Sequence, residues 1–98
     1  MSRYWISAVR FDDENRHIDV LLEHYDDGAG FGVGTATTRT SVLWRIHDDH
    51  AEYGTMSLVG NKWKVGARVG VVTVNGVSYL RTDGECIAAD DLGGLPRF

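Results

Sequence analysis

The segment HDDH at residues 47–50 gathers two histidines and two aspartates in consecutive positions. Imidazole nitrogens and carboxylate oxygens are common ligands of zinc and related ions, so this segment is the first candidate for chemistry. On a continuous helix, His47 and His50 would lie near one face and could both reach one metal ion. A third ligand would then have to come from His17 or His24, elsewhere in the chain.

The same segment also fits a turn, and this is the interpretation we adopt. The zinc motif carried by helices places its histidines four residues apart with a glutamate beside the first, whereas His47 and His50 are three apart. Calcium loops need an alternating acidic framework that this segment lacks. If a helix ends near His47, the two aspartates form a solvated turn into the next strand. We therefore expect no cofactor and no functional metal site. His47 and His50 are the candidate ligands of the alternative, in which a metal is bound.

Other catalytic patterns are not found in the sequence. Cys86 follows the acidic residues Asp83 and Glu85, which disfavour the reactive thiolate. The serines lie outside any Gly-x-Ser-x-Gly elbow. Paired aspartates at 12–13, 26–27 and 90–91 are adjacent in predicted loops, and nothing gives one carboxylate a different role from its neighbour. The sequence therefore predicts no catalytic residues and a protein that is not an enzyme.

The N-terminal half predicts two strands and a helix. Residues 3–11 and 17–25 are rich in β-branched and aromatic side chains, which favours a hairpin of two strands. The helix is predicted within 38–49, with Thr38 as its N-cap and with apolar residues at helical spacing. Between them, alternating glycines at 28–34 lack the spacing of a phosphate-binding loop, so we expect a plain loop. The sequence does not tell whether this loop is ordered or moves on binding.

The C-terminal half predicts only strands and a tail. The alternation of apolar residues predicts strands at 51–59, 62–65, 69–74 and 77–82. The pairs Gly60-Asn61 and Asn75-Gly76 mark tight hairpin turns, in which Asn-Gly suits two residues of positive φ. The fold class is therefore α+β: a small twisted antiparallel sheet, in the order β-β-α-β-β-β, with one helix packed on it.

The tail ends in apolar residues around a Gly-Gly pair and the only proline. Leu92, Leu95 and Phe98 are too apolar to remain in water, so we predict that the tail is part of the fold. A small sheet with one helix has a face or an edge left to cover. The 98 residues then make one domain, 1–98.

Composition limits the classes of function. The net charge of −4, from 10 basic and 14 acidic residues, argues against general nucleic-acid binding. A single cysteine excludes an internal disulfide. No apolar run approaches the roughly 20 residues of a membrane span, so we expect no membrane association and a cytoplasmic location.

Two tryptophans and an arginine are the candidates for binding a partner. Trp44 lies off the apolar stripe of the predicted helix, and Arg45 follows it. Interfaces favour tryptophan and arginine at their centres. Trp63 alternates with Lys62 and Lys64, which predicts an inward ring and outward lysines on a strand. Contact of this triplet with a phosphate backbone is the alternative. The predicted interaction residues are Trp44, Arg45 and Trp63.

The motifs of the chain resemble those of a known family. The run NKWKVGARVGVVTVNGVSYLRTDG is followed by DDLGGLP, and the chain opens with a Tyr-x-Ile-x-Ala-Val-Arg strand. This pattern resembles a family of small bacterial proteins, also found near phage and mobile elements, that is known as a domain of unknown function. The matching positions are Tyr4, Ile6, Ala8, Val9, Arg10, Thr38, Arg39, Asn61, Lys62, Trp63, Gly66, Tyr79, Arg81, Thr82, Asp83, Leu92, Gly93, Leu95, Pro96 and Phe98.

The chain departs from the family pattern in small ways. Asp91 stands where the family more often has asparagine, and the glycine loop is unusually rich. The resemblance implies a bacterial or phage setting and the same order of elements. It implies no known activity, cofactor or catalytic residue.

The resulting function hypothesis is a non-enzymatic protein-protein interaction module with an unidentified protein partner. A homodimer formed through a sheet edge is left open. The alternative is a phage-type inhibitor that blocks a host nucleic-acid-binding defence machine by acidic mimicry. A second alternative is a metal-dependent enzyme or accessory that uses His47 and His50. The sequence identifies neither the partner, nor the biological process, nor the oligomeric state.

Overall fold

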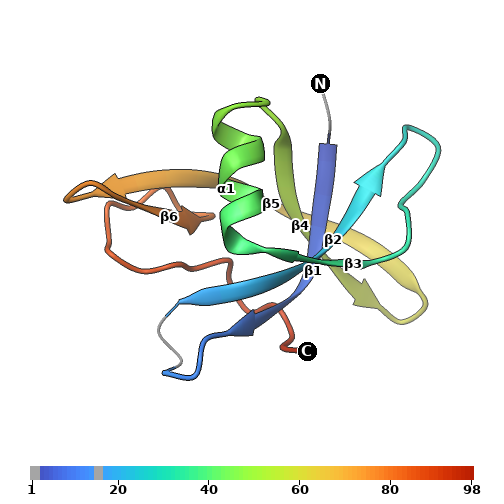
Figure 1. The fold of residues 1–98 in the computed structure, drawn as a ribbon. Helices are drawn as coiled ribbons and strands as arrows, with labels where there is room; N and C mark the ends of the chain where they lie inside the picture. Colours follow the sequence, from blue (N-terminus) through green and yellow to red (C-terminus); the bar gives the residue numbers. More distant parts are fainter. Residues whose placement is uncertain (1–2, 15–16) are drawn as a thin grey trace.

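The computed structural model describes residues 3–14 and 17–98. These residues form an α+β fold in which one helix packs on a six-stranded, mostly antiparallel sheet (Figure 1). The elements are β1 (Arg3–Phe11), β2 (Ile18–Asp26), β3 (Thr35–Thr38), α1 (Arg39–His47), β4 (Glu52–Val59), β5 (Lys62–Val74) and β6 (Val77–Arg81). Within the described part, no helix is long and apolar enough to cross a membrane.

The sheet is mixed, so the prediction of a purely antiparallel sheet is wrong. Its strand order is β3-β2-β1-β4-β5-β6, and β1 and β4 run parallel over the pairs from Arg3–Glu52 to Ile6–Thr55. The helix returns the chain to the side of β1, and this connection makes the two strands parallel. β3 was predicted as loop and helix cap. Its threonine-rich residues favour an extended backbone, and they pair antiparallel with β2.

β5 is one long strand, whereas the sequence predicted two. Its first half pairs with β4 and its second half pairs with β6. A bulge at Gly66 and Ala67 interrupts the first pairing, and the Ala67 amide donates to Thr55 Oγ1 at 3.1 Å. A Cβ atom at Gly66 would lie 2.6 Å from Thr55 Oγ1, so the bulge needs glycine there. The bulge bends β5 and lets one strand serve both parts of the sheet.

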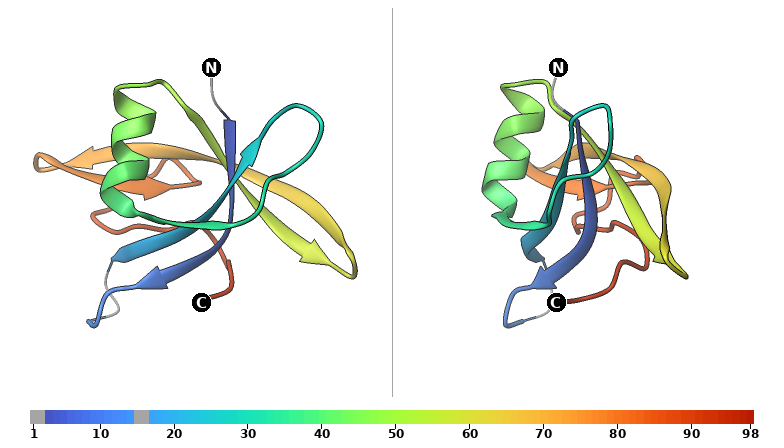
Figure 2. Two further views of the ribbon diagram at one scale, coloured as in Figure 1. Left: turned by 45° about the vertical axis from the view of Figure 1, so that its right-hand side comes forward. Right: turned by 90° about the vertical axis from the view of Figure 1, so that its right-hand side faces the viewer.

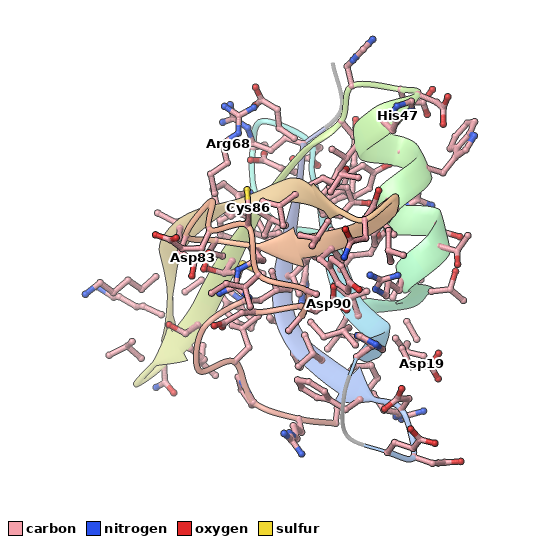
Figure 3. The ribbon with its side chains drawn as sticks, turned by 90° about the vertical axis from the view of Figure 1, so that its left-hand side faces the viewer. Asp19, His47, Arg68, Asp83, Cys86 and Asp90 are labelled. Carbon is pink, nitrogen blue, oxygen red and sulfur yellow. The ribbon has the colours of Figure 1, made fainter. Side chains whose placement is uncertain are left out.

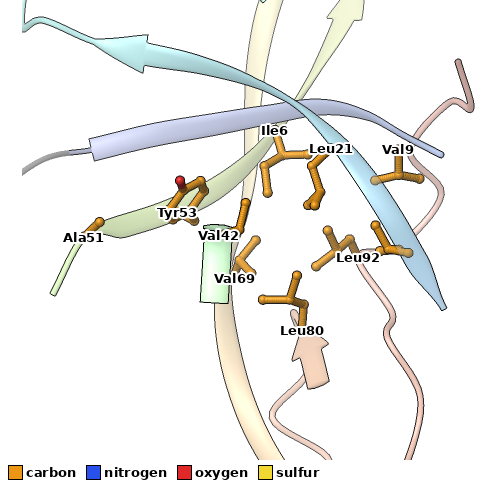
Figure 4. Close-up of a cluster of buried hydrophobic side chains, with 10 residues drawn as sticks. Ile6, Val9, Leu21, Val42, Ala51, Tyr53, Val69, Leu80 and Leu92 are labelled. Atoms are coloured by element: carbon orange, nitrogen blue, oxygen red, sulfur yellow. The ribbon is translucent and has the colours of Figure 1, made fainter. Parts of the chain in front are cut away.

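The core lies between α1 and the concave side of the sheet (Figures 2 and 4). Thr38 caps the helix as predicted, because its side chain accepts a hydrogen bond from the Ser41 amide. Val42 of α1 is fully buried. Leu43 and Ile46 pack against the core partly buried, so the predicted apolar stripe is confirmed. The other buried members of the core are Ile6, Val9, Ile18, Leu21, Ala51, Tyr53, Val69, Leu80 and Leu92.

An ion pair ties the start of the helix to three other segments. The Asp90 carboxylate accepts hydrogen bonds from the Ile18 amide at 3.1 Å and from the Leu80 amide at 2.9 Å. It also receives the Arg39 guanidinium, whose Nε lies 2.7 Å from Asp90 Oδ2. The Arg39 guanidinium donates further to the Ser78 carbonyl. With the bond from Arg39 Nη2 to Asp90 Oδ1 at 3.0 Å, four hydrogen bonds to one buried carboxylate hold α1, β2 and β6 at one point.

The tail connects β6 to β1 through backbone hydrogen bonds. The Asp91 amide donates to the Leu80 carbonyl at 2.8 Å, next to β6. Further along, the Val9 amide donates to the Pro96 carbonyl at 2.9 Å, and the Phe98 amide donates to the Val9 carbonyl at 3.1 Å. The tail therefore lies along the edge of β1 beyond its pairing with β4, and the prediction that it belongs to the fold is confirmed for Leu92, which is buried, and Leu95, which packs partly buried on the core. The prediction is wrong for the Phe98 side chain, which is 39% exposed.

Replacing Gly76 with valine is expected to destabilise the β5–β6 hairpin. Asn75 and Gly76 have φ of 52° and 80°, so the Asn-Gly turn prediction is confirmed. A β-branched residue resists positive φ, and Gly76→Val should cost about 1–3 kcal/mol of unfolding free energy. Denaturant melts measure this cost. Gly94→Val is the matched control, since Gly94 faces open space at ordinary φ. Equal losses in the two variants would contradict the assignment.

Deleting residues 91–98 is expected to destabilise the domain severely. The deletion removes the buried Leu92 and the hydrogen bonds to Val9. Leu92→Ala alone should cost about 2–5 kcal/mol, because it leaves a cavity in the core. Thermal melts test both variants, with Val33→Ala as a control at a fully solvated side chain. A free recruiting peptide would instead leave the melting temperature within about a degree of the full chain.

Candidate functional site

The HDDH segment is a turn, as the preferred interpretation predicted. α1 ends at His47 and Asp48 is its C-cap, so the helix does not continue to His50. His50 has a φ of 54°, and its side chain and that of His47 are exposed. Figure 3 shows His47 at the end of the helix, away from Asp83 and Asp90. In residues 3–14 and 17–98, no group of three or more histidine, cysteine, aspartate or glutamate side chains is placed to hold a metal.

Arg45 is held inside the fold. Its guanidinium donates to Glu23 and, at 3.2 Å, to the Tyr53 hydroxyl, and it lies 5.1 Å from the ring centroid of Tyr4. The hydrogen bond with Tyr53 contributes most to raising the pKa of Arg45. Burial raises the pKa of Tyr53 in turn. These contacts anchor α1 on β1, β2 and β4. Trp44 beside it is 56% exposed and lies on the outer side of the helix.

A serine and a histidine that the sequence did not single out lie together beneath the other face of the sheet. His24 Nδ1 is 2.9 Å from the Gly32 carbonyl, and its Nε2 is 2.7 Å from Ser7 Oγ. A carbonyl only accepts, so Nδ1 carries the proton and donates to it. Nε2 is then the acceptor of the Ser7 hydroxyl. This is the orientation that activates serine nucleophiles when a substrate can approach.

The Ser7–His24 pair is closed to a substrate in this structure. Both side chains are buried. The Trp63 ring packs against His24 with 5.4 Å between ring centroids. A Cβ atom at Gly34 would lie only 3.0 Å from His24 Cε1, so the glycine loop also lies close to the ring. The pair therefore satisfies buried polar groups and supports Trp63 from below.

A hollow of about 300 Å³ opens beside Trp5, which is the cross-strand neighbour of His24. One wall is the Trp5 ring, which lies over Gly54. A Cβ atom on Gly54 would be only 2.6 Å from Trp5 Cζ3. Glu52 lies 2.8 Å from Arg3 Nη2 and 4.0 Å from Arg68 Nη2. The Arg3 hydrogen bond holds the pKa of Glu52 below its ordinary value. Two guanidinium groups share the one carboxylate of Glu52, so the charged side chains of the hollow keep a net positive charge, and both arginine side chains are largely in solvent.

The clearest candidate surface is the end of the β4–β5 hairpin, residues 56–65, which we call the arm. β1 pairs with β4 only as far as Thr55, and beyond that point the two strands of the arm extend away from the body (Figures 1 and 2). The turn at Gly60 has a φ of 63°, which confirms the predicted Gly60-Asn61 turn.

The two faces of the arm differ in chemistry. Cross-strand partners share a face of a sheet, and successive residues alternate between faces. One face, the apolar face, carries Met56, Leu58, Trp63 and Val65. The other, the lysine face, carries Ser57, Val59, Lys62 and Lys64. The predicted alternation of Trp63 with the lysines is therefore confirmed.

The apolar face is open to water over most of its length. Leu58 is 57% exposed, Trp63 41% and Val65 52%, while Met56 is buried at the base. The Trp63 ring thus lies half over His24 and half in solvent, rather than fully inward as predicted. The surrounding sequence is basic: residues 53–82 contain four lysines and arginines and no aspartate or glutamate. The arm is therefore an apolar and locally positive projection on an acidic chain.

In comparisons with protein-family models, curated proteins and solved structures, nothing matches this chain. The family resemblance described above therefore stays a prediction, and the functional argument depends on the geometry of the site.

Purified protein is expected to contain no stoichiometric zinc, nickel or manganese. EDTA should leave its melting temperature unchanged, because among the described residues no third ligand lies near the exposed His47 and His50. Elemental analysis and melts with and without chelator measure this, and His47→Ala should match the parent chain. One tightly held metal per chain would contradict the turn interpretation, since a structural metal adds directly to folding free energy.

Proposed function

We propose that this chain is a non-enzymatic protein-protein interaction module that binds a protein partner through the apolar face of the arm. The observation that carries the proposal is the exposure of Leu58, Trp63 and Val65 on one face of a projecting hairpin. Two strands alone bury little apolar surface, so these side chains contribute little to the stability of the arm itself. Exposed contiguous apolar surface with a polar rim is typical of interaction sites.

Trp63 is the central residue of the proposed contact. Tryptophan is favoured in the middle of interfaces, where its ring buries a large area at a small cost in entropy. Its ring is also held from below by His24. A supported ring loses little further freedom when a partner covers it, and this favours binding.

Trp44 and Arg45 contribute less to this proposal. Arg45 already uses its guanidinium for Glu23 and Tyr53. Trp44 is carried by α1, which covers the other face of the sheet, so it cannot join the same contact as Trp63 (Figure 2). It is kept as a separate, second surface.

The other functions considered have less support. Acidic mimicry by a phage-type inhibitor needs carboxylates gathered on one face. The 14 acidic residues here are spread along the chain, at 12–14, 19, 23, 26–27, 48–49, 52, 83, 85 and 90–91. Several of them, such as Glu23 and Asp90, already pair with arginines of the same chain. The metal-dependent function relies on His47 and His50, which the helix end places on a solvated turn.

Leu58→Asp is expected to abolish partner binding without unfolding the domain. The substitution puts a charge in the middle of the apolar face at a side chain that is already largely in water. Tagged chains incubated with extract of the native host show which proteins are retained, and a binding titration with the retained protein should show a loss of at least about tenfold.

Ile87→Asp is the matched control, because Ile87 is similarly exposed but lies in the loop after β6. It should bind as the parent chain does. Thermal melts of both variants exclude misfolding. If Leu58→Asp retains full binding, or if Trp44→Ala removes it instead, the arm is not the interaction surface.

A further inference from the structure

We propose that the arm binds its partner by strand addition: an extended acidic segment of the partner protein pairs with the free edge of β4 at residues 56–59, with apolar side chains alternating with acidic ones. The inference rests on the interaction function proposed above and gives it a binding mode and a partner chemistry. Strand addition supplies affinity through main-chain hydrogen bonds and specificity through alternate side chains.

The first step is the free edge. β4 has β5 on one side along its whole length, but β1 accompanies it on the other side only to Thr55. Further along β1, at Val9, the tail occupies the neighbouring position. Among the described residues, no strand or bridge pairs with residues 56–59 on that side. Every second residue there directs its amide and carbonyl outward, which makes the segment a template for another strand.

The other edges of the sheet are less suited to this role. The outer edge of β6 is occupied, since the Asp91 amide donates to the Leu80 carbonyl at 2.8 Å and Arg39 donates to the Ser78 carbonyl. β3 is an open edge, but it has only four residues and presents threonine and alanine rather than large apolar side chains. The β5 edge of the arm is also unpaired among the described residues on the side away from β4, because β6 pairs with β5 only from Gly70 onward. That edge carries Lys62 and Lys64 itself, and lysines on an edge strand discourage pairing with other strands. Strand addition there would shift the NMR signals of residues 62–68 instead of 56–59.

The second step is the chemistry of the added strand. A strand placed beside β4 continues the pleat, so its side chains alternate between the two faces of the arm. On the apolar face they meet Leu58 and the neighbouring Trp63. On the lysine face they meet Ser57 and Val59, with Lys62 and Lys64 one strand further, within reach of long flexible side chains. An alternating apolar and acidic sequence therefore matches both faces at once.

A second copy of this chain fits the edge less well. Two β4 strands that pair antiparallel are related by a two-fold axis perpendicular to the sheet, so their lysine faces fall on the same side. The arm carries no acidic residue, so a second copy would leave Lys62 and Lys64 of both copies without a partner charge, whereas an acidic strand supplies one.

A nucleic-acid strand also fits less well. Stacking of bases on Trp63 would need cations on the same face to contact the phosphates. Lys62 and Lys64 are on the opposite face. On the Trp63 side, Arg3 and Arg68 already pair with Glu52.

The test uses the full chain and three synthetic peptides of about eight residues, the length of an ordinary strand. One alternates valine with glutamate, the second has the same composition in two blocks, and the third alternates valine with lysine. We expect the first to shift the backbone NMR signals of residues 56–59 and to slow their amide exchange. Its dissociation constant should be at least about tenfold lower than those of the other two peptides.

Charge reversal tests the chemistry separately from the fold. The double variant Lys62→Glu/Lys64→Glu should prefer the valine-lysine peptide, whereas Lys62→Arg/Lys64→Arg should keep the preference of the parent chain. Both lysines are exposed on a projecting hairpin, so neither variant disturbs the core.

Several results would overturn the inference. Equal binding of the alternating and block peptides, no binding of either, or shifts away from residues 56–59 would exclude strand addition of an acidic segment. Tighter binding of oligothymidylate at the arm would assign the surface to nucleic acid. Dimerisation of the chain with shifts at 56–59 would assign it to a second copy.

The experiments distinguish an error in the binding mode from an error in the proposed function. If Leu58→Asp no longer binds the host protein but the alternating peptide does not bind the parent chain, the interaction function is supported and strand addition is wrong. If Leu58→Asp retains the host protein, the proposed function itself is wrong, whatever the peptides do.

Discussion

The Asp90 carboxylate is the buried charge around which one end of the molecule is built. It has no solvent exposure, and its oxygens accept from Arg39 and from the amides of Ile18 and Leu80. Removing one partner of a buried ion pair typically costs about 3–5 kcal/mol, because the other charge is left uncompensated. The start of α1, the strand β2 and the strand β6 are thus fixed together, and the tail that follows Asp90 is directed along the sheet toward β1. The arm, in contrast, keeps an open edge beyond the last pair of β1 with β4 at Thr55.

The sequence predicted the features that depend on neighbouring residues. The turn at Asn75-Gly76, the cap at Thr38 and the first strand follow from local backbone preferences, and the structure confirms them. The sequence did not predict β3, the parallel pairing of β1 with β4, or the continuity of β5. Those features depend on which strands meet in space. The bulge at Gly66 illustrates this, since its glycine is needed only because Thr55 of another strand lies against it.

The sequence predicted only part of the candidate site, because it shows local patterns and not the contacts between strands. Trp63 stood out because it alternates with two lysines, and this local pattern gives the two faces of the arm. The free edge beside it could not be predicted, because it exists only where β1 and β4 diverge. Arg45 looked available in sequence, yet its partner Glu23 comes from a strand 22 residues earlier. The contact of Ser7 with His24 likewise joins two strands and has no sequence signature.

The hydrogen bonds between the tail and β1 also bear on how quickly the domain folds. Arg10 bonds to the carbonyl of Phe98 across a separation of 88 residues, and the Val9 backbone pairs with the same end of the chain. Contacts between such distant segments carry a large loop-closure entropy, and topologies rich in them fold slowly. We expect the local hairpins to form first and the closure of the tail onto β1 to come late. Until that step, the outer edge of β1 is open, and the nascent domain is exposed to pairing with other chains.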